Sequence, residues 1–135
     1  MNTVTRKLVP EDRRADHADE IFGLDFPLRL EPTVFTFADR LSPDYRGGYW
    51  QFYGLSNGGF YLSPDADISF EVVSENGYRG RMSAEAFGIT VCLYAYSHLS
   101  FGHDEFARKC ASQFHLLREY ALDHAQVAAI LAAID

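Results

Sequence analysis

The stretch that decides the fold runs from Gly47 to Pro64 and reads GGYWQFYGLSNGGFYLSP. Asn57-Gly58 is among the strongest short signals for a hairpin turn, because both residues tolerate the positive φ that tight turns require. Aromatic and branched residues, which favour strands, flank the turn on both sides. We therefore predict two antiparallel strands, over residues 49–55 and 59–63.

A second hairpin is expected around Asn76-Gly77. A two-residue loop would place Arg81 on the same face as Val72, whereas the three-residue loop 75–77, with glycine in the left-handed conformation, sets Arg81 opposite Glu71. Opposite charges across two strands are favourable. We predict the three-residue loop, and with it a four-stranded antiparallel meander with strands near 49–55, 59–63, 68–73 and 78–82.

Helices are expected on both sides of these strands along the chain. Pro10 can open a first helix that ends before Gly23, and a second begins near Pro32, although residues 34–37 could equally form a short strand. Ser83 is a plausible N-cap for a long apolar helix that ends at Gly102, and two further helices follow. The predicted fold is α+β: a four-stranded antiparallel meander sheet packed by N-terminal and C-terminal helices.

Length and composition indicate one compact unit. The chain has 135 residues and is 47% hydrophobic, with 11 Phe and 8 Tyr, which is enough for a core without a metal or disulfide. We predict a single domain over residues 1–135. The N-terminus lacks the apolar segment of a signal peptide, and the most apolar stretch, residues 84–99, is shorter than the roughly 20 residues of a membrane span. The expected location is cytoplasmic, without a membrane partner.

Net charge restricts the partners. The chain has 19 acidic and 12 basic residues, a net charge of -7, which opposes binding to nucleic acid. Imitation of DNA is equally disfavoured, since B-DNA presents about one negative charge per 1.7 Å of its axis. Here acidic residues lie next to arginines along the chain, as in the run Glu11-Asp12-Arg13-Arg14.

The common catalytic and cofactor motifs are absent from the sequence. It contains no GxxxxGK[ST], GxGxxG or GxSxG motif, so neither a phosphate loop nor a nucleophile elbow is indicated. Cys92 and Cys110 fall at predicted core positions, where a thiol has no reason to become reactive. We predict no cofactor and no catalytic residue.

A metal site is the alternative that histidines and acids in the last third of the chain suggest. His98, His103 and Cys110 could contribute ligands, but no HExxH motif or histidine pair at helical spacing is present. We therefore predict no metal there, with His98 half-buried and hydrogen-bonded and with His103 and His124 exposed.

Aromatic residues of the first hairpin are the candidate interaction surface. Exposed rings on a sheet can stack single-stranded bases, but residues 47–76 contain no basic residue to attract a phosphate backbone. Contact with another protein is the better interpretation for whichever part of the hairpin stays exposed. The candidates are Tyr49, Trp50 and Tyr61.

The hairpin motif resembles the KlcA/ArdB family of antirestriction proteins. The similarity extends to other motifs on both sides of it. These are Leu8-Val9-Pro10, Phe22-Gly23, Ala38-Asp39-Arg40-Leu41, Asn76-Gly77-Tyr78, Gly80, Met82-Ser83-Ala84 and the apolar helix through His98-Leu99. The resemblance covers most of the chain, and the last helix is its least distinctive part.

This resemblance implies an α+β protein of plasmids and other mobile elements that protects incoming, unmodified DNA from type I restriction enzymes inside the cell. Family members are not known as enzymes and are not regarded as DNA mimics. The expected function is therefore non-catalytic antirestriction, acting on the type I restriction-modification system directly or indirectly. The alternative is a nucleic-acid-binding accessory protein of a mobile element, using Arg6, Lys7, Arg13 and Arg14.

Overall fold

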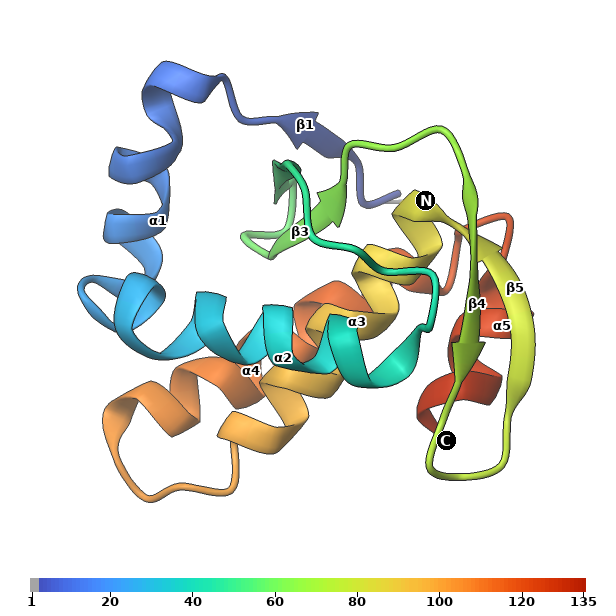
Figure 1. Ribbon diagram of the computed structural model, residues 1–135. Coiled ribbons are helices and arrows are strands. Elements are labelled where there is room, and N and C mark those ends of the chain that lie inside the picture. The colour runs from blue at the N-terminus through green and yellow to red at the C-terminus, as the bar shows by residue number, and fades with distance from the viewer. Residues whose placement is uncertain (1–2) are drawn as a thin grey trace.

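Figure 1 shows the computed structural model, which describes residues 3–135. The chain forms helices together with antiparallel strands, which confirms the α+β class. In chain order the elements are β1 (Arg6–Leu8), η1 (Glu11–Arg13), α1 (Arg14–Phe22), η2 (Phe26–Leu30), α2 (Glu31–Leu41), β2 (Trp50–Leu55), β3 (Phe60–Pro64), β4 (Ser69–Val73), β5 (Arg79–Ser83), α3 (Ala84–Leu99), α4 (Glu105–Ala121) and α5 (Val127–Ile134).

The four predicted strands all form, but the prediction of a single meander is wrong. They divide into a three-stranded sheet of order β1-β2-β3 and a separate two-stranded sheet, β4-β5. The unexpected strand, β1, pairs with β2, with Lys7 opposite Gly54. The first hairpin has Phe52 opposite Leu62, and its turn contains Gly58 at φ 92°.

The outer edge of β3 explains why β4 does not join the first sheet. Side chains of α3 already form hydrogen bonds with the backbone groups along this edge. The Tyr96 hydroxyl donates to the Phe60 carbonyl at 2.8 Å. The Cys92 thiol lies 3.4 Å from the Leu62 nitrogen and 3.6 Å from the Leu62 oxygen. Because these groups have partners in a helix, a further strand has nothing to pair with on that side.

The register of the second hairpin is as predicted. Glu71 lies opposite Arg81 and Val72 opposite Gly80, and the Ser74 amide donates to the Tyr78 carbonyl at 2.9 Å, which closes the three-residue loop. Gly77 at the end of this loop has φ 93°, in the left-handed region that favours glycine.

Local signals also located the helices. Gly23 follows α1 with φ 60°, and residues 34–37 belong to α2 rather than to a strand. The Ser83 hydroxyl accepts a hydrogen bond from the Ala86 amide at 3.1 Å and so caps α3. This helix ends at Leu99, ahead of Gly102.

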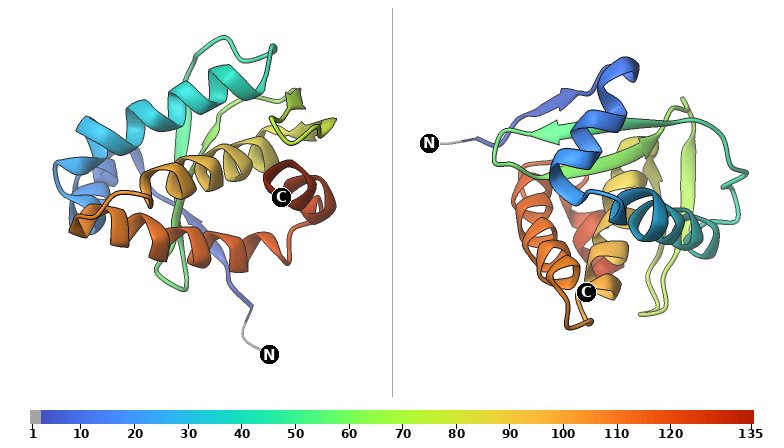
Figure 2. Two further views of the ribbon diagram at one scale, coloured as in Figure 1. Left: turned by 90° about the horizontal axis from the view of Figure 1, so that it is seen from below. Right: turned by 90° about the vertical axis from the view of Figure 1, so that its left-hand side faces the viewer.

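Helix α3 occupies the centre of the molecule. Figure 2 shows it between α2 on one side and α4 on the other, with α5 beside its first turns and the β1-β2-β3 sheet across the helices. Its residues from Ala86 to Leu93 are all buried, so it has no solvent-facing side there. A helix that is apolar all round requires this central position.

Gly88→Ala tests how closely α3 approaches β3. A Cβ atom at this position would lie 2.5 Å from the Leu62 carbonyl oxygen, against backbone that cannot rotate away. We expect the free energy of unfolding, measured by urea denaturation, to fall by about 3 kcal/mol. The control Gly102→Ala, whose Cβ would lie 3.3 Å from the Ala107 Cβ, should change it by no more than about 0.5 kcal/mol. Equal losses in both variants would contradict this account.

Candidate functional site

The three aromatic candidates do not lie on one surface. Tyr49 is 46% exposed, whereas Trp50 and Tyr61 are 3% and 0% exposed. The Trp50 indole N–H donates to the Tyr45 hydroxyl at 3.2 Å, and its ring packs on Phe35 with centroids 5.5 Å apart. Of the three, only Tyr49 is therefore accessible to a binding partner. The Arg14 guanidinium lies 4.4 Å from the centroid of its ring.

Tyr61 instead belongs to a polar group that we call the Glu85 cluster. Its five members come from β1, β3, the first turn of α3, α4 and the loop after α4; they are Arg6, Tyr61, Glu85, Tyr120 and His124. Oε1 of Glu85 accepts from the Tyr61 hydroxyl at 2.7 Å and the Tyr120 hydroxyl at 3.1 Å. The Arg6 Nη1 lies 3.3 Å from the same oxygen, and the His124 Nε2 lies 3.6 Å from Oε2.

These partners keep Glu85 ionised. His124 first, then Tyr61, Arg6 and Tyr120, lower the pKa of Glu85 to about 2, against the opposing effect of its partial burial. Burial raises the pKa of Tyr61, and its hydrogen bond to the Glu85 carboxylate raises it further. A carboxylate with this many donors around it is a poor proton acceptor for a substrate, so the cluster joins five segments rather than forming a general base.

The sequence did not identify this cluster. His124, expected to be exposed, is half-buried against Glu85. Glu85 had only one recognisable signal, which is its position just after the Ser83 N-cap, where an acidic side chain favours the helix dipole. Its partners are separated from it by up to 79 residues in the sequence, so no local pattern relates them.

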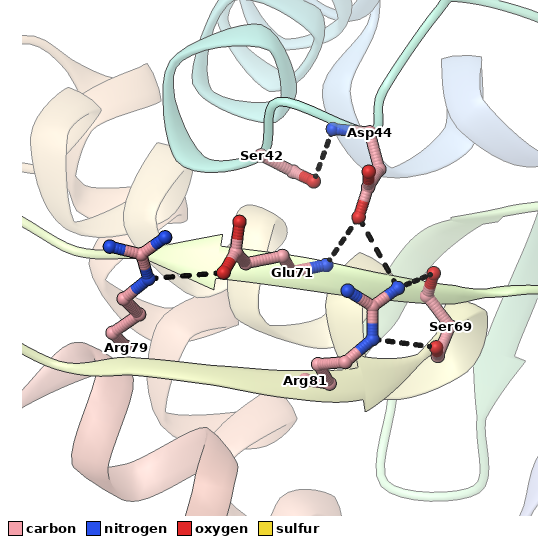
Figure 3. Close-up of polar contacts among 6 residues, drawn as sticks. All are labelled: Ser42, Asp44, Ser69, Glu71, Arg79 and Arg81. Carbon is pink, nitrogen blue, oxygen red and sulfur yellow. Dashed lines mark hydrogen bonds and ion pairs between the residues drawn. The ribbon is translucent and has the colours of Figure 1, made fainter.

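A second polar network joins the segment after α2 to the β4-β5 hairpin (Figure 3). The Asp44 carboxylate accepts from the Glu71 amide at 2.8 Å and from Arg81 Nη2 at 3.4 Å. Although Glu71 and Arg81 are cross-strand neighbours, the Glu71 carboxylate pairs with Arg79, 3.0 Å from its Nε. Arg81 also donates to the Ser69 hydroxyl at 3.0 Å. The charges in this network compensate one another.

The residues weighed as metal ligands lie apart. Within residues 3–135, no three or more His, Cys, Asp or Glu side chains are placed to hold an ion. His98, expected to be half-buried, is exposed and lies edge-on to Phe37, while His103 is exposed as expected. Burial raises the pKa of both the Cys92 and the Cys110 thiols to about 12, which keeps them unreactive at neutral pH. The absence of a cofactor remains a prediction.

No helix among the described residues is both long enough and apolar enough to cross a membrane.

The four basic residues of the alternative function separate into two pairs. Arg6 belongs to the Glu85 cluster, and Arg14 lies over Tyr49 and Phe52 and donates to the Gln51 side chain at 3.2 Å. Lys7 and Arg13 instead line a surface groove of about 580 Å³ between β1 and the η1–α1 segment. Two of the four are therefore occupied by contacts within the fold.

Glu85→Gln tests the electrostatic role of the cluster. It removes charge-assisted hydrogen bonds, so we expect a loss of about 1–3 kcal/mol in the free energy of unfolding at pH 7. The folded pKa of about 2 lies below the ordinary value of 4.5, so Glu85 stabilises the fold above pH 4.5 and ceases to do so as the pH falls towards 2. Urea denaturation from pH 7 to pH 3 should show the difference from wild type narrowing below pH 4.5. Glu20→Gln, at an exposed position of α1, is the matched control, and a pH-independent difference for Glu85→Gln would contradict the assignment.

Known proteins resemble the chain over its full length. A family model described as Antirestriction protein matches residues 43–135. Antirestriction protein KlcA of Escherichia coli is 40% identical over 142 residues, covering 100% of both chains. The uncharacterized protein YafX of Escherichia coli K12 is 43% identical over 131 residues, covering 94% of this chain and 85% of its own.

A similar solved structure indicates the same family as the family model and the KlcA relative do. It has a TM-score of 0.91 and 39% sequence identity, and it covers 100% of each chain. It is described as showing, for the KlcA and ArdB proteins, a novel fold and antirestriction activity against Type I DNA restriction systems in vivo but not in vitro. By sequence and by fold, this chain belongs to the antirestriction protein family.

Proposed function

We propose that this protein protects incoming, unmodified DNA from type I restriction enzymes inside the cell, as a single non-catalytic domain that does not imitate DNA. The observation that carries the proposal is its full-length similarity to KlcA and ArdB proteins, for which activity in vivo but not in vitro is described. The partner is the type I restriction-modification system, reached directly or through another cellular component.

The distribution of charge supports a mechanism other than DNA imitation. A mimic needs a face of uncompensated carboxylates with roughly the charge density of DNA. Here acidic side chains from several elements lie against arginines, as in the pairs Glu71–Arg79, Asp44–Arg81 and Asp104–Arg29. Such pairing reduces the field that a DNA-binding groove would recognise.

The alternative, a nucleic-acid-binding accessory protein, has weaker support. Its basic cluster is divided, because Arg6 and Arg14 have partners within the fold. Phosphate contacts would have to come from Lys7 and Arg13, on a chain whose net charge of -7 repels a phosphate backbone.

The test compares plating of unmodified phage on hosts with a type I or a simple type II restriction system, each with and without this protein. We expect higher plating efficiency under type I restriction and little change under type II. Purified type I enzyme should cleave unmodified DNA equally well in the presence of the purified protein. Stoichiometric, salt-sensitive inhibition of the purified enzyme would contradict the mechanism, since it is the behaviour of a DNA mimic.

Tyr49→Ala tests the exposed part of the aromatic hairpin. Because Tyr49 is 46% exposed, the variant should keep nearly all its thermal stability while protection in cells falls. Ile68→Ala, at another exposed apolar position, should alter neither. Trp50→Ala should instead lower stability by about 3–5 kcal/mol, because it empties a core position, and lose protection for that reason. Full protection by Tyr49→Ala would place the working surface elsewhere.

A further inference from the structure

We infer that the outer edge of β1, together with the groove between β1 and the η1–α1 segment, binds an extended, acidic segment of another protein. The inference concerns binding alone and does not depend on the proposed antirestriction function. It rests on two features that meet on β1: an unpaired strand edge and a cationic groove whose lining contains no carboxylate.

The strand edge follows from the hydrogen bonds between β1 and β2. The Ser56 amide donates to the Thr5 carbonyl at 2.8 Å, and the Val9 amide donates to the Phe52 carbonyl at 2.8 Å. In an antiparallel pair alternate residues face the partner strand, so the peptide groups of Arg6 and Leu8 face away from β2. Within residues 3–135, β1 is the last strand on that side of its sheet. A free edge of this kind can accept an added strand.

The groove beside β1 carries positive charge. Its lining includes Lys7, Arg13 and His17 and contains no carboxylate, although the chain as a whole has a net charge of -7. Within residues 3–135, neither Lys7 nor Arg13 forms an ion pair, whereas Arg6, Arg29, Arg40, Arg79 and Arg81 all do. The rest of the lining is uncharged and consists of Thr5, Leu8, Val9, Pro10, Gly54, Leu55 and Ser56.

His17 forms the α1 side of the groove. Its ring stacks on Phe60 with centroids 5.6 Å apart, and its Nε2 is buried without a hydrogen-bond partner among the described residues. Glycine at position 54 leaves room for the His17 ring, because a Cβ atom on residue 54 would lie 3.0 Å from the His17 Cε1. Glycine at position 54 therefore lets the His17 ring form this wall of the groove.

The charge around β1 determines which kind of partner fits its outer edge. A second copy pairing along the same edge would bring Arg6 and Lys7 of the two copies together, and like charges across strands are destabilising. A nucleic acid needs a series of cationic side chains along its phosphate backbone, whereas the groove offers only Lys7 and Arg13. An extended segment that alternates acidic and apolar residues fits instead, because its two faces can meet Lys7 and Leu8, which point to opposite faces of β1.

The binding experiment uses a short, capped, fluorescently labelled peptide of alternating valine and glutamate, with fluorescence anisotropy as the readout. We expect saturable binding to the wild-type protein and none by a valine–lysine peptide of the same length. A valine–glutamate peptide with N-methyl groups on alternate residues keeps its charge but cannot add to a strand edge, and it should bind at least about tenfold more weakly.

The protein variant Lys7→Glu/Arg13→Glu reverses the charge of the groove and should weaken binding by at least about tenfold. Arg46→Glu/Lys109→Glu makes the same change in net charge at two exposed positions away from β1 and should bind as the wild type does. Thermal denaturation of both variants confirms that the fold is intact. The inference is overturned if the wild type does not bind the peptide at millimolar concentration, if both double variants bind equally, or if single-stranded DNA competes for the groove more strongly than the peptide.

Discussion

The close approach of α3 to the outer edge of β3 is the constraint on which the rest of the fold depends. Gly88 leaves room for the helix to lie against the Leu62 carbonyl, and Cys92 and Tyr96 then bond to backbone groups that would otherwise pair with a strand. A helix so placed is covered on all sides, which is why α2, α4 and α5 surround it. The same placement ends the first sheet at β3, and β4 and β5 therefore form a separate hairpin.

Local patterns predicted much of this fold. The Asn-Gly turns, the Ser83 cap and the alternation that fixed the Glu71–Arg81 register each involve residues within about a dozen positions of one another, and the structure confirms them. The arrangement of the sheets could not be predicted in this way. It depends on Cys92 and Tyr96, whose side chains form hydrogen bonds with the edge of β3. The sequence pattern indicates only that both residues belong to an apolar core helix.

For the candidate sites too, local patterns identified residues, whereas their exposure and contacts depend on segments that are distant in the sequence. The sequence identified the aromatic hairpin, but which rings are exposed depends on the helices that cover it, so Trp50 and Tyr61 are buried and Tyr49 is not. Basic residues that are adjacent in the sequence likewise have different roles: Arg14 stacks on aromatic rings, while its neighbour Arg13 lines the groove. The Glu85 cluster has no counterpart in any local pattern because its members come from five elements.

The dependence of β3 on α3 also sets an order of events during synthesis. The backbone groups of β3 that face α3 leave the ribosome well before Cys92 and Tyr96, which follow Leu62 and Phe60 by 30 and 36 residues. Until then the first hairpin presents an aromatic strand with an unpaired edge, the kind of surface that promotes aggregation of partly made chains. Contacts between such distant residues also slow folding, because a long loop must close before they form. The nascent chain therefore passes through a vulnerable interval that ends only when α3 covers the hairpin.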